Sequence, residues 1–192
     1  MAAKYAIIIH GWSGSPEEKP IAWLARELEA SGLSVTVPRM PHPNKPTIND
    51  WVETIAKNVV DSEKTIIIGH SIGCQAVLRY LQSSKKKFSG VFLVAPWLKI
   101  KPGALNDEET KIALPWQNTP LDLSNIKKKS DSFYFFYSTN DPFVSVDDSL
   151  TLKNKIGGEL HNLGEKGHIS EDDGIFEWPE MLELIEKNFI LR

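Results

Sequence analysis

Residues 64–74 read KTIIIGHSIGC, and this stretch decides the fold. The run at 65–68 is apolar on both sides of an extended chain, which predicts a strand buried inside a sheet. Residues 69–73, GHSIG, then fit the pattern G-x-S-x-G, and residues 71–81 continue with helical spacing. A strand, a tight turn and a helix in this order predict a strained serine, Ser71, at the carboxyl end of a central strand.

Short apolar runs alternate with amphipathic stretches along the rest of the chain. Strands are expected at 5–9, 33–37, 65–68, 91–94, 133–137 and 159–163, and helices at 20–31, 51–61, 71–81, 150–156 and 178–189. Apolar strands that alternate with helices predict a mostly parallel sheet covered on both faces and joined by right-handed crossovers. The sequence therefore predicts the α/β class, as a three-layer sandwich with a central sheet of about six strands.

Two segments need separate interpretation. Asn49-Asp50 is expected to cap the helix at 51–61, with Val60 at the end of its apolar stripe. Residues 96–130 carry prolines at 96, 102, 115 and 120 together with two tryptophans, so we expect an irregular excursion there. Long irregular segments of compact domains are often functional.

Composition narrows the class of protein. The chain has 192 residues, 41% of them hydrophobic and 24% charged, which suits a single globular domain spanning 1–192. A net charge of −3 argues against a nucleic-acid partner, because such proteins usually carry a basic excess. Cys74 is the only cysteine, which excludes an internal disulfide. Since the first apolar run is too short for a signal peptide or a membrane span, we expect a cytoplasmic protein without membrane contact.

A serine nucleophile needs a histidine base, and the base needs an orienting carboxylate. On a serine elbow of this kind the chain order is Ser, then Asp or Glu, then His. His168 lies in a loop past the last expected strand, where active-site groups of parallel sheets gather, whereas His161 lies within that strand. Asp141 is the first carboxylate after the strand at 133–137. Ser71, Asp141 and His168 are therefore the candidate catalytic residues.

The candidate oxyanion hole consists of two backbone N–H groups. The helix that follows Ser71 directs its free N–H groups and its positive dipole end toward the turn, so the N–H of Ile72 is expected to face an oxyanion. The second donor is expected in the loop after the first strand, where Gly11 allows a close bend and Trp12 offers its N–H.

The candidate substrate-binding residues are aromatic: His10, Trp97, Trp116 and Phe143. Aromatic side chains in loops after strands indicate an apolar acyl or leaving group. Ordinary packing explains the same residues equally well. Because no large cap and no long apolar lid are visible, small carboxyl esters or amides are the expected substrates.

Several stretches together resemble a known family, namely HGWSG at 10–14, GHSIG at 69–73, DPF at 141–143 and GH at 167–168. Their order and spacing resemble the α/β-hydrolase superfamily. The stretches at 40–43 (MPHP), 63–73 (EKTIIIGHSIG) and 139–145 (TNDPFVS) resemble its small retinoblastoma-binding protein 9-like serine hydrolases. The likeness covers 4–189 and implies a compact serine hydrolase without a cofactor, with Ser71, Asp141 and His168 as nucleophile, acid and base.

One departure from that family concerns a partner. The name-giving protein carries an L-x-C-x-E stretch before its central strand, thought to engage retinoblastoma-type pocket proteins. Here the equivalent stretch at 59–63 reads VVDSE and lacks the cysteine. A pocket-protein partner is therefore not expected.

Other functions remain open from the sequence. One is a protein-interaction module on a hydrolase scaffold with little activity, since a fold alone never proves catalysis. Another is an acyltransferase or thioesterase, which differs only in the acyl acceptor. A metal site or a phosphate-binding loop is not expected, because neither H-x-x-x-H nor G-x-x-x-x-G-K-[ST] occurs.

Overall fold

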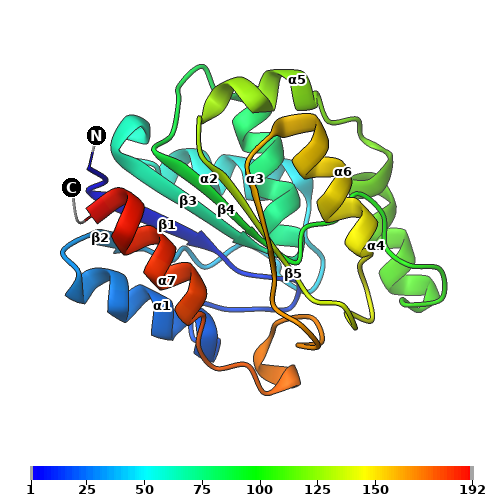
Figure 1. The fold of residues 1–192 in the computed structure, drawn as a ribbon. Helices are drawn as coiled ribbons and strands as arrows, with labels where there is room; N and C mark the ends of the chain where they lie inside the picture. The colour runs from blue at the N-terminus through cyan, green and yellow to red at the C-terminus, as the bar shows by residue number, and fades with distance from the viewer. Residues whose placement is uncertain (1, 191–192) are drawn as a thin grey trace.

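The computed structural model describes residues 2–190 and is built on one parallel sheet (Figure 1). Six strands pair in the order β2-β1-β3-β4-β5-β6, and each neighbouring pair is parallel. The strands are β1 (Tyr5–Ile9), β2 (Ser34–Thr36), β3 (Thr65–His70), β4 (Gly90–Val94), β5 (Phe133–Tyr137) and β6 (Glu159–Asn162). The predicted α/β architecture is thus confirmed.

Helices cover both faces of the sheet. They are α1 (Lys19–Ala30), α2 (Ile48–Asn58), α3 (Ile72–Ser83), α4 (Asp107–Asn118), α5 (Leu123–Ile126), α6 (Val146–Ile156) and α7 (Pro179–Ile185). Helices α1 and α7 lie on one face, and α2, α3 and α6 lie on the other (Figure 1). Every residue of β3 is buried between these layers, which explains its run of isoleucines.

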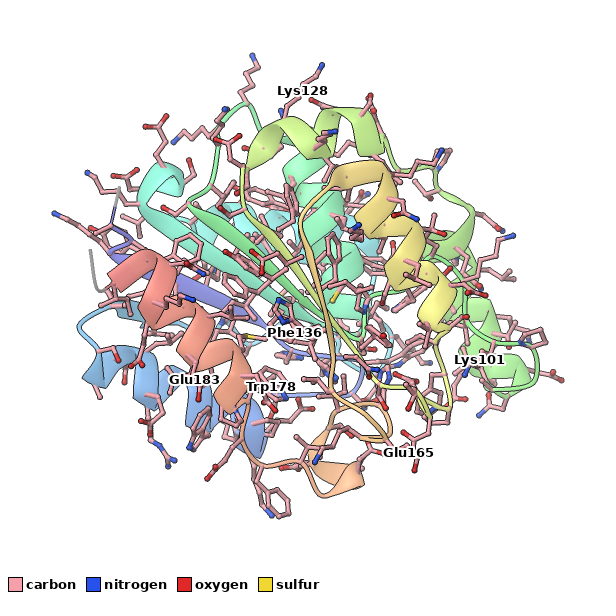
Figure 2. The ribbon with its side chains drawn as sticks, viewed as in Figure 1. Lys101, Lys128, Phe136, Glu165, Trp178 and Glu183 are labelled. Carbon is pink, nitrogen blue, oxygen red and sulfur yellow. The ribbon has the colours of Figure 1, made fainter. Side chains whose placement is uncertain are left out.

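The strand order indicates where a ligand could bind, namely at the carboxyl ends of the strands, which we call the carboxyl edge of the sheet. β1 and β3 are neighbours, with Ile9 opposite Gly69, while β2 lies on the far side of β1. The direction of winding therefore reverses between β1 and β3, where open α/β sheets bind ligands. Figure 2 shows Lys101 and Glu165, which follow β4 and β6, at this edge, and Lys128 at the opposite end of the molecule.

The prediction that 96–130 forms an irregular excursion is wrong, because this segment contains α4 and α5. Helix α4 begins at a capping box in which Asn106 and Glu109 bond each other's backbone N–H groups, and Pro115 lies inside the helix. The N-x-x-E pattern is a helix-start signal, and it outweighs the prolines here.

The expected cap of α2 is also wrong. Thr47 is the N-cap, since its side chain accepts a hydrogen bond from the N–H of Asp50 at 3.3 Å. The helix ends at Asn58, and the side chain of Val60 is 70% exposed instead of lying on an apolar stripe.

Two further expectations concern the whole chain. Within the described part of the chain, no helix is both long and apolar enough to cross a bilayer. A single domain spanning 1–192 stays a prediction, and its residues 1, 191 and 192 lie outside the described part.

The close approach of α3 to β1 yields a prediction about Gly73. A Cβ at this position would lie 2.7 Å from the carbonyl oxygen of His10 and closer still to that of Ile9. Gly73→Ala should therefore lower the free energy of unfolding by about 1–3 kcal/mol or more, measured by thermal and urea unfolding. Gly103→Ala is the control, because Gly103 has a positive φ of 77° but no atom within 4 Å of its added methyl group. Equal losses in the two variants would contradict the steric argument.

Candidate active site

Ser71 occupies a strained turn between β3 and α3. Its φ of 55° and ψ of −120° lie in a region that side-chain-bearing residues seldom adopt. A Cβ at Gly69 would lie 2.9 Å from the backbone of Gly73, so both glycines are needed to close the turn. The N–H of Ser71 donates to the carbonyl of Val94 at 2.9 Å, which ties the turn to β4.

Cys74 lies one turn into α3 behind this serine. Its thiol donates to the carbonyl oxygens of Gly69 at 3.0 Å and Val94 at 3.2 Å. The side chain is fully buried, and burial raises the pKa of the thiol far above its ordinary value.

Ser71, His168 and Asp141 come together at the carboxyl edge of the sheet. The distance from Ser71 Oγ to His168 Nε2 is 2.7 Å, and that from His168 Nδ1 to Asp141 Oδ2 is 2.8 Å. Asp141 is 3% exposed, whereas the His168 side chain is 13% exposed and borders the cleft. The structure thus brings together the three residues that the sequence singled out.

Asp141 is held as a carboxylate by its surroundings. Its Oδ1 accepts hydrogen bonds from the N–H groups of Phe143 at 2.8 Å and Val144 at 3.0 Å. Burial alone would raise the pKa of Asp141, but the hydrogen bond and charge of His168 and these two N–H groups together lower it. Lys101, which the sequence analysis missed, donates to the backbone carbonyl of Asp141 at 2.6 Å and steadies the loop.

The loop after β1 carries the candidate oxyanion donor Trp12. The loop forms a turn that is closed by a 3.2 Å hydrogen bond from Gly14 N to Gly11 O. The N–H of Trp12 takes no part in this hydrogen bond. The Trp12 indole donates to the carbonyl of Asn44 at 3.2 Å, which anchors the loop on the segment after β2. Ile72 is the first residue of α3, a position whose N–H has no acceptor within a helix.

His10 does not line the cleft. Its side chain is 1% exposed, its Nδ1 lies 2.9 Å from the Gly11 carbonyl, and its Nε2 lies 3.1 Å from the Met40 N–H. The carbonyl accepts and the N–H donates, so the ring is neutral with its proton on Nδ1. The suggested substrate-binding role is therefore wrong, and His10 instead joins the loop after β1 to the segment at Met40.

Trp97 and Trp116 are also core residues. Each is 1% exposed, and the Trp116 indole donates to the Pro46 carbonyl at 3.2 Å. Packing, the alternative explanation, accounts for both. Phe143 does line the cleft, where its ring packs edge-on against the His168 ring with centroids 5.0 Å apart.

A cleft of about 530 Å³ opens above Ser71. Its lining includes apolar side chains, namely Trp12, Ile100, Leu105, Pro142 and Phe143. It also includes carboxylates, namely Glu18, Glu109, Asp172 and Asp173. Part of this lining comes from α4 and the segment before it, which the sequence analysis read as irregular chain.

Glu18 is a cleft residue that the sequence analysis missed. Burial, together with the negative charges of Glu171 and Asp172, raises its pKa from 4.5 to about 7. No local sequence signal marks this residue, because the acidic neighbours come from a segment more than 150 positions away along the chain.

No group of three or more His, Cys, Asp or Glu side chains within residues 2–190 could hold a metal ion.

A parallel sheet with a serine turn after β3, an aspartate loop after β5 and a histidine loop after β6 defines an α/β hydrolase. The family model described as serine hydrolase matches residues 6–187. The chain therefore belongs to the serine hydrolase family.

Known proteins are similar to this chain over nearly its whole length. Protein YdeN of Bacillus subtilis (strain 168) is 28% identical over 190 residues, which cover 97% of this chain and 96% of that protein. Serine hydrolase RBBP9 of Rattus norvegicus is 25% identical over 181 residues, covering 94% and 87%. The crystal structure of the B. subtilis ydeN gene product matches with a TM-score of 0.87 at 26% identity, covering 97% of this chain and 99% of that one. These relatives support a hydrolytic enzyme of this family.

The raised pKa of Glu18 predicts a pH-dependent stability. Because the folded state holds the Glu18 proton more tightly than the unfolded state, ionisation destabilises the fold increasingly as the pH rises from 4.5 toward 7. Glu18→Gln should therefore be more stable than wild type at pH 8, by roughly 2 kcal/mol, and should lose this advantage near pH 4. Urea unfolding at both pH values measures the difference.

The control for this prediction is Glu29→Gln. Glu29 is an exposed glutamate near the other end of α1, and its replacement removes the same charge. A Glu18→Gln advantage that does not change with pH would contradict the assignment.

Proposed function

We propose that Ser71, His168 and Asp141 form a catalytic triad that cleaves small carboxyl esters or amides through an acyl-enzyme. The observation that carries this proposal is the continuous hydrogen-bonded chain from Asp141 Oδ2 through the His168 ring to Ser71 Oγ, with contacts of 2.8 and 2.7 Å. The carboxylate accepts from Nδ1–H, so Nε2 is free to take the proton of the serine hydroxyl.

The proposed reaction has two halves. Ser71 Oγ attacks the substrate carbonyl carbon while its proton moves to His168 Nε2, and the imidazolium that forms is stabilised by Asp141. His168 then returns the proton to the leaving oxygen or nitrogen as the carbonyl–leaving-group bond breaks. A water molecule repeats the sequence on the acyl-enzyme, giving the carboxylic acid and free Ser71.

The N–H groups of Trp12 and Ile72 are the proposed donors to the oxyanion. Both N–H groups lie in turns at the carboxyl edge of the sheet, and the α3 dipole adds positive potential beside Ser71. Removing one such donor typically costs about 3 kcal/mol of transition-state stabilisation.

The shape of the cleft supports small substrates. A volume of about 530 Å³ lies within the range of small-molecule sites, and apolar lining residues such as Trp12 and Phe143 suit an apolar acyl or leaving group. No large cap covers the cleft in the described part of the chain, so little surface is available to shield a long acyl chain.

We also propose a cytoplasmic location and a small-molecule partner only. The stretch at 59–63 has no cysteine for a pocket-protein motif, and the net charge of −3 does not favour nucleic acid.

Labelling with a fluorophosphonate probe tests the nucleophile. Wild type should be labelled at Ser71, and Ser71→Ala should lose both labelling and at least about a thousandfold in kcat, because nothing else in the triad attacks carbon. Ser89→Ala is the control, since Ser89 donates to the Glu63 carbonyl at the opposite edge of the sheet. Continued labelling of a folded Ser71→Ala protein would refute the assignment.

Esters of graded acyl length test the substrate class. For p-nitrophenyl esters we expect kcat/KM to be highest for acetyl and butyryl groups and to fall steadily toward dodecanoyl, because the cleft has no cover for a long chain. A maximum at the dodecanoyl ester would rule out the proposed preference.

A further inference from the structure

His168 is held through its backbone as well as through its ring. Its N–H donates to Asp173 Oδ2 at 2.9 Å, and its carbonyl oxygen lies 2.9 Å from His70 Nε2. The loop around it contains Gly164 and Gly167, both with positive φ, and Ile169 also has a positive φ of 59°. A loop with this backbone needs outside contacts to hold the imidazole in one place.

His70 supplies one of these contacts from inside the sheet. It is the last residue of β3, directly precedes Ser71, and is only 4% exposed. Its ring lies 5.2 Å from the His168 ring and 5.8 Å from the Trp178 ring. A Cβ at Gly11 would lie 3.0 Å from His70 Nδ1, so the ring also packs against the loop after β1 that carries Trp12. His70 therefore contacts all the loops that carry the proposed reacting groups except that of Asp141.

The protonation state of His70 follows from its partner. A carbonyl oxygen only accepts, so Nε2 carries the hydrogen, and Nδ1 has no hydrogen-bond partner among the described residues. Burial, followed by the charge of His168, lowers the pKa of His70 to about 4. At neutral pH the ring is thus an uncharged donor that does not compete with His168 for a proton.

We propose that His70 is a positioning residue for the base: its Nε2–H fixes the His168 carbonyl and thereby holds the imidazole at hydrogen-bonding distance from Ser71. This inference rests on the proposed triad. The residue before the nucleophile thus connects the rigid end of β3 to a loop that lies 98 positions further along the chain. A shift of about 1 Å in a catalytic group costs up to a hundredfold in rate, so a single hydrogen bond to this loop is sufficient to matter.

A matched pair of variants separates this role from simple packing. His70→Gln places an amide N–H close to the position of Nε2, whereas His70→Met has a similar length and volume but no donor. His70 also lines the cleft, so KM does not serve as the control here. With p-nitrophenyl acetate, His70→Met should lower kcat by about 10- to 100-fold, because the lost hydrogen bond joins two protein groups and acts on the position of the base. His70→Gln should recover most of that loss, and the rate of fluorophosphonate labelling should follow kcat.

Controls keep each outcome interpretable. His161→Gln changes a histidine within β6, away from the cleft, and should leave kcat unchanged. If His70→Met does not fold, His70→Asn replaces it, because its shorter amide cannot reach the His168 carbonyl.

Each result then supports or overturns the inference. A donor-free variant with wild-type kcat, or a His70→Gln variant as slow as His70→Met, would overturn the positioning role while labelling of wild type at Ser71 leaves the triad standing. Absence of wild-type labelling would remove the triad and this inference with it.

Discussion

The structure depends on one close approach between two backbones at Ser71. The serine holds a φ of 55°, a conformation that typically costs about 1–3 kcal/mol and persists only where its surroundings impose it. Gly73 packs against the carbonyl oxygens of Ile9 and His10, and Gly69 packs against Gly73. The same contact that forms the turn therefore also sets the start of α3 against the end of β1. A single steric constraint therefore places both Ser71 and the loop after β1 that carries Trp12.

The parallel arrangement of the strands brings the other loops of the site together. Because all six strands run in one direction, the loops after β1, β3, β5 and β6 emerge at one edge, and residues separated by 97 positions come within 2.7 Å of each other. Side chains that form hydrogen bonds with the backbone of Asp141 and His168 then fix the position of these two residues more closely. Lys101 bonds the carbonyl of Asp141, while Asp173 and His70 bond the N–H and carbonyl of His168. The sheet thus positions the three candidate catalytic side chains, and polar contacts around each loop hold their backbone in place.

What the sequence could predict followed from local signals. The strands, the strained serine, the first carboxylate after β5 and the histidine after β6 are all marked by residue type and position in the chain. The missed features depend on contacts between distant segments. Trp97 and Trp116 are buried by elements that no local pattern brings together, and α4 was overlooked because its prolines weighed more than its Asn106–Glu109 capping box. No local signal marks His70 either, because its hydrogen bond goes to the backbone of His168, which lies 98 positions further along the chain.

Cys74 is the one thiol in the chain, and its place behind the nucleophile has a chemical consequence. Its sulfur is enclosed by β3, β4 and α3 and lies within hydrogen-bonding distance of two carbonyl oxygens. Burial raises the pKa of this thiol and so disfavours the thiolate that oxidants and alkylating agents require. An electrophile that enters from solvent meets the hydroxyl and not the sulfur. The folded enzyme thereby presents no exposed thiol for glutathione adducts or intermolecular crosslinks.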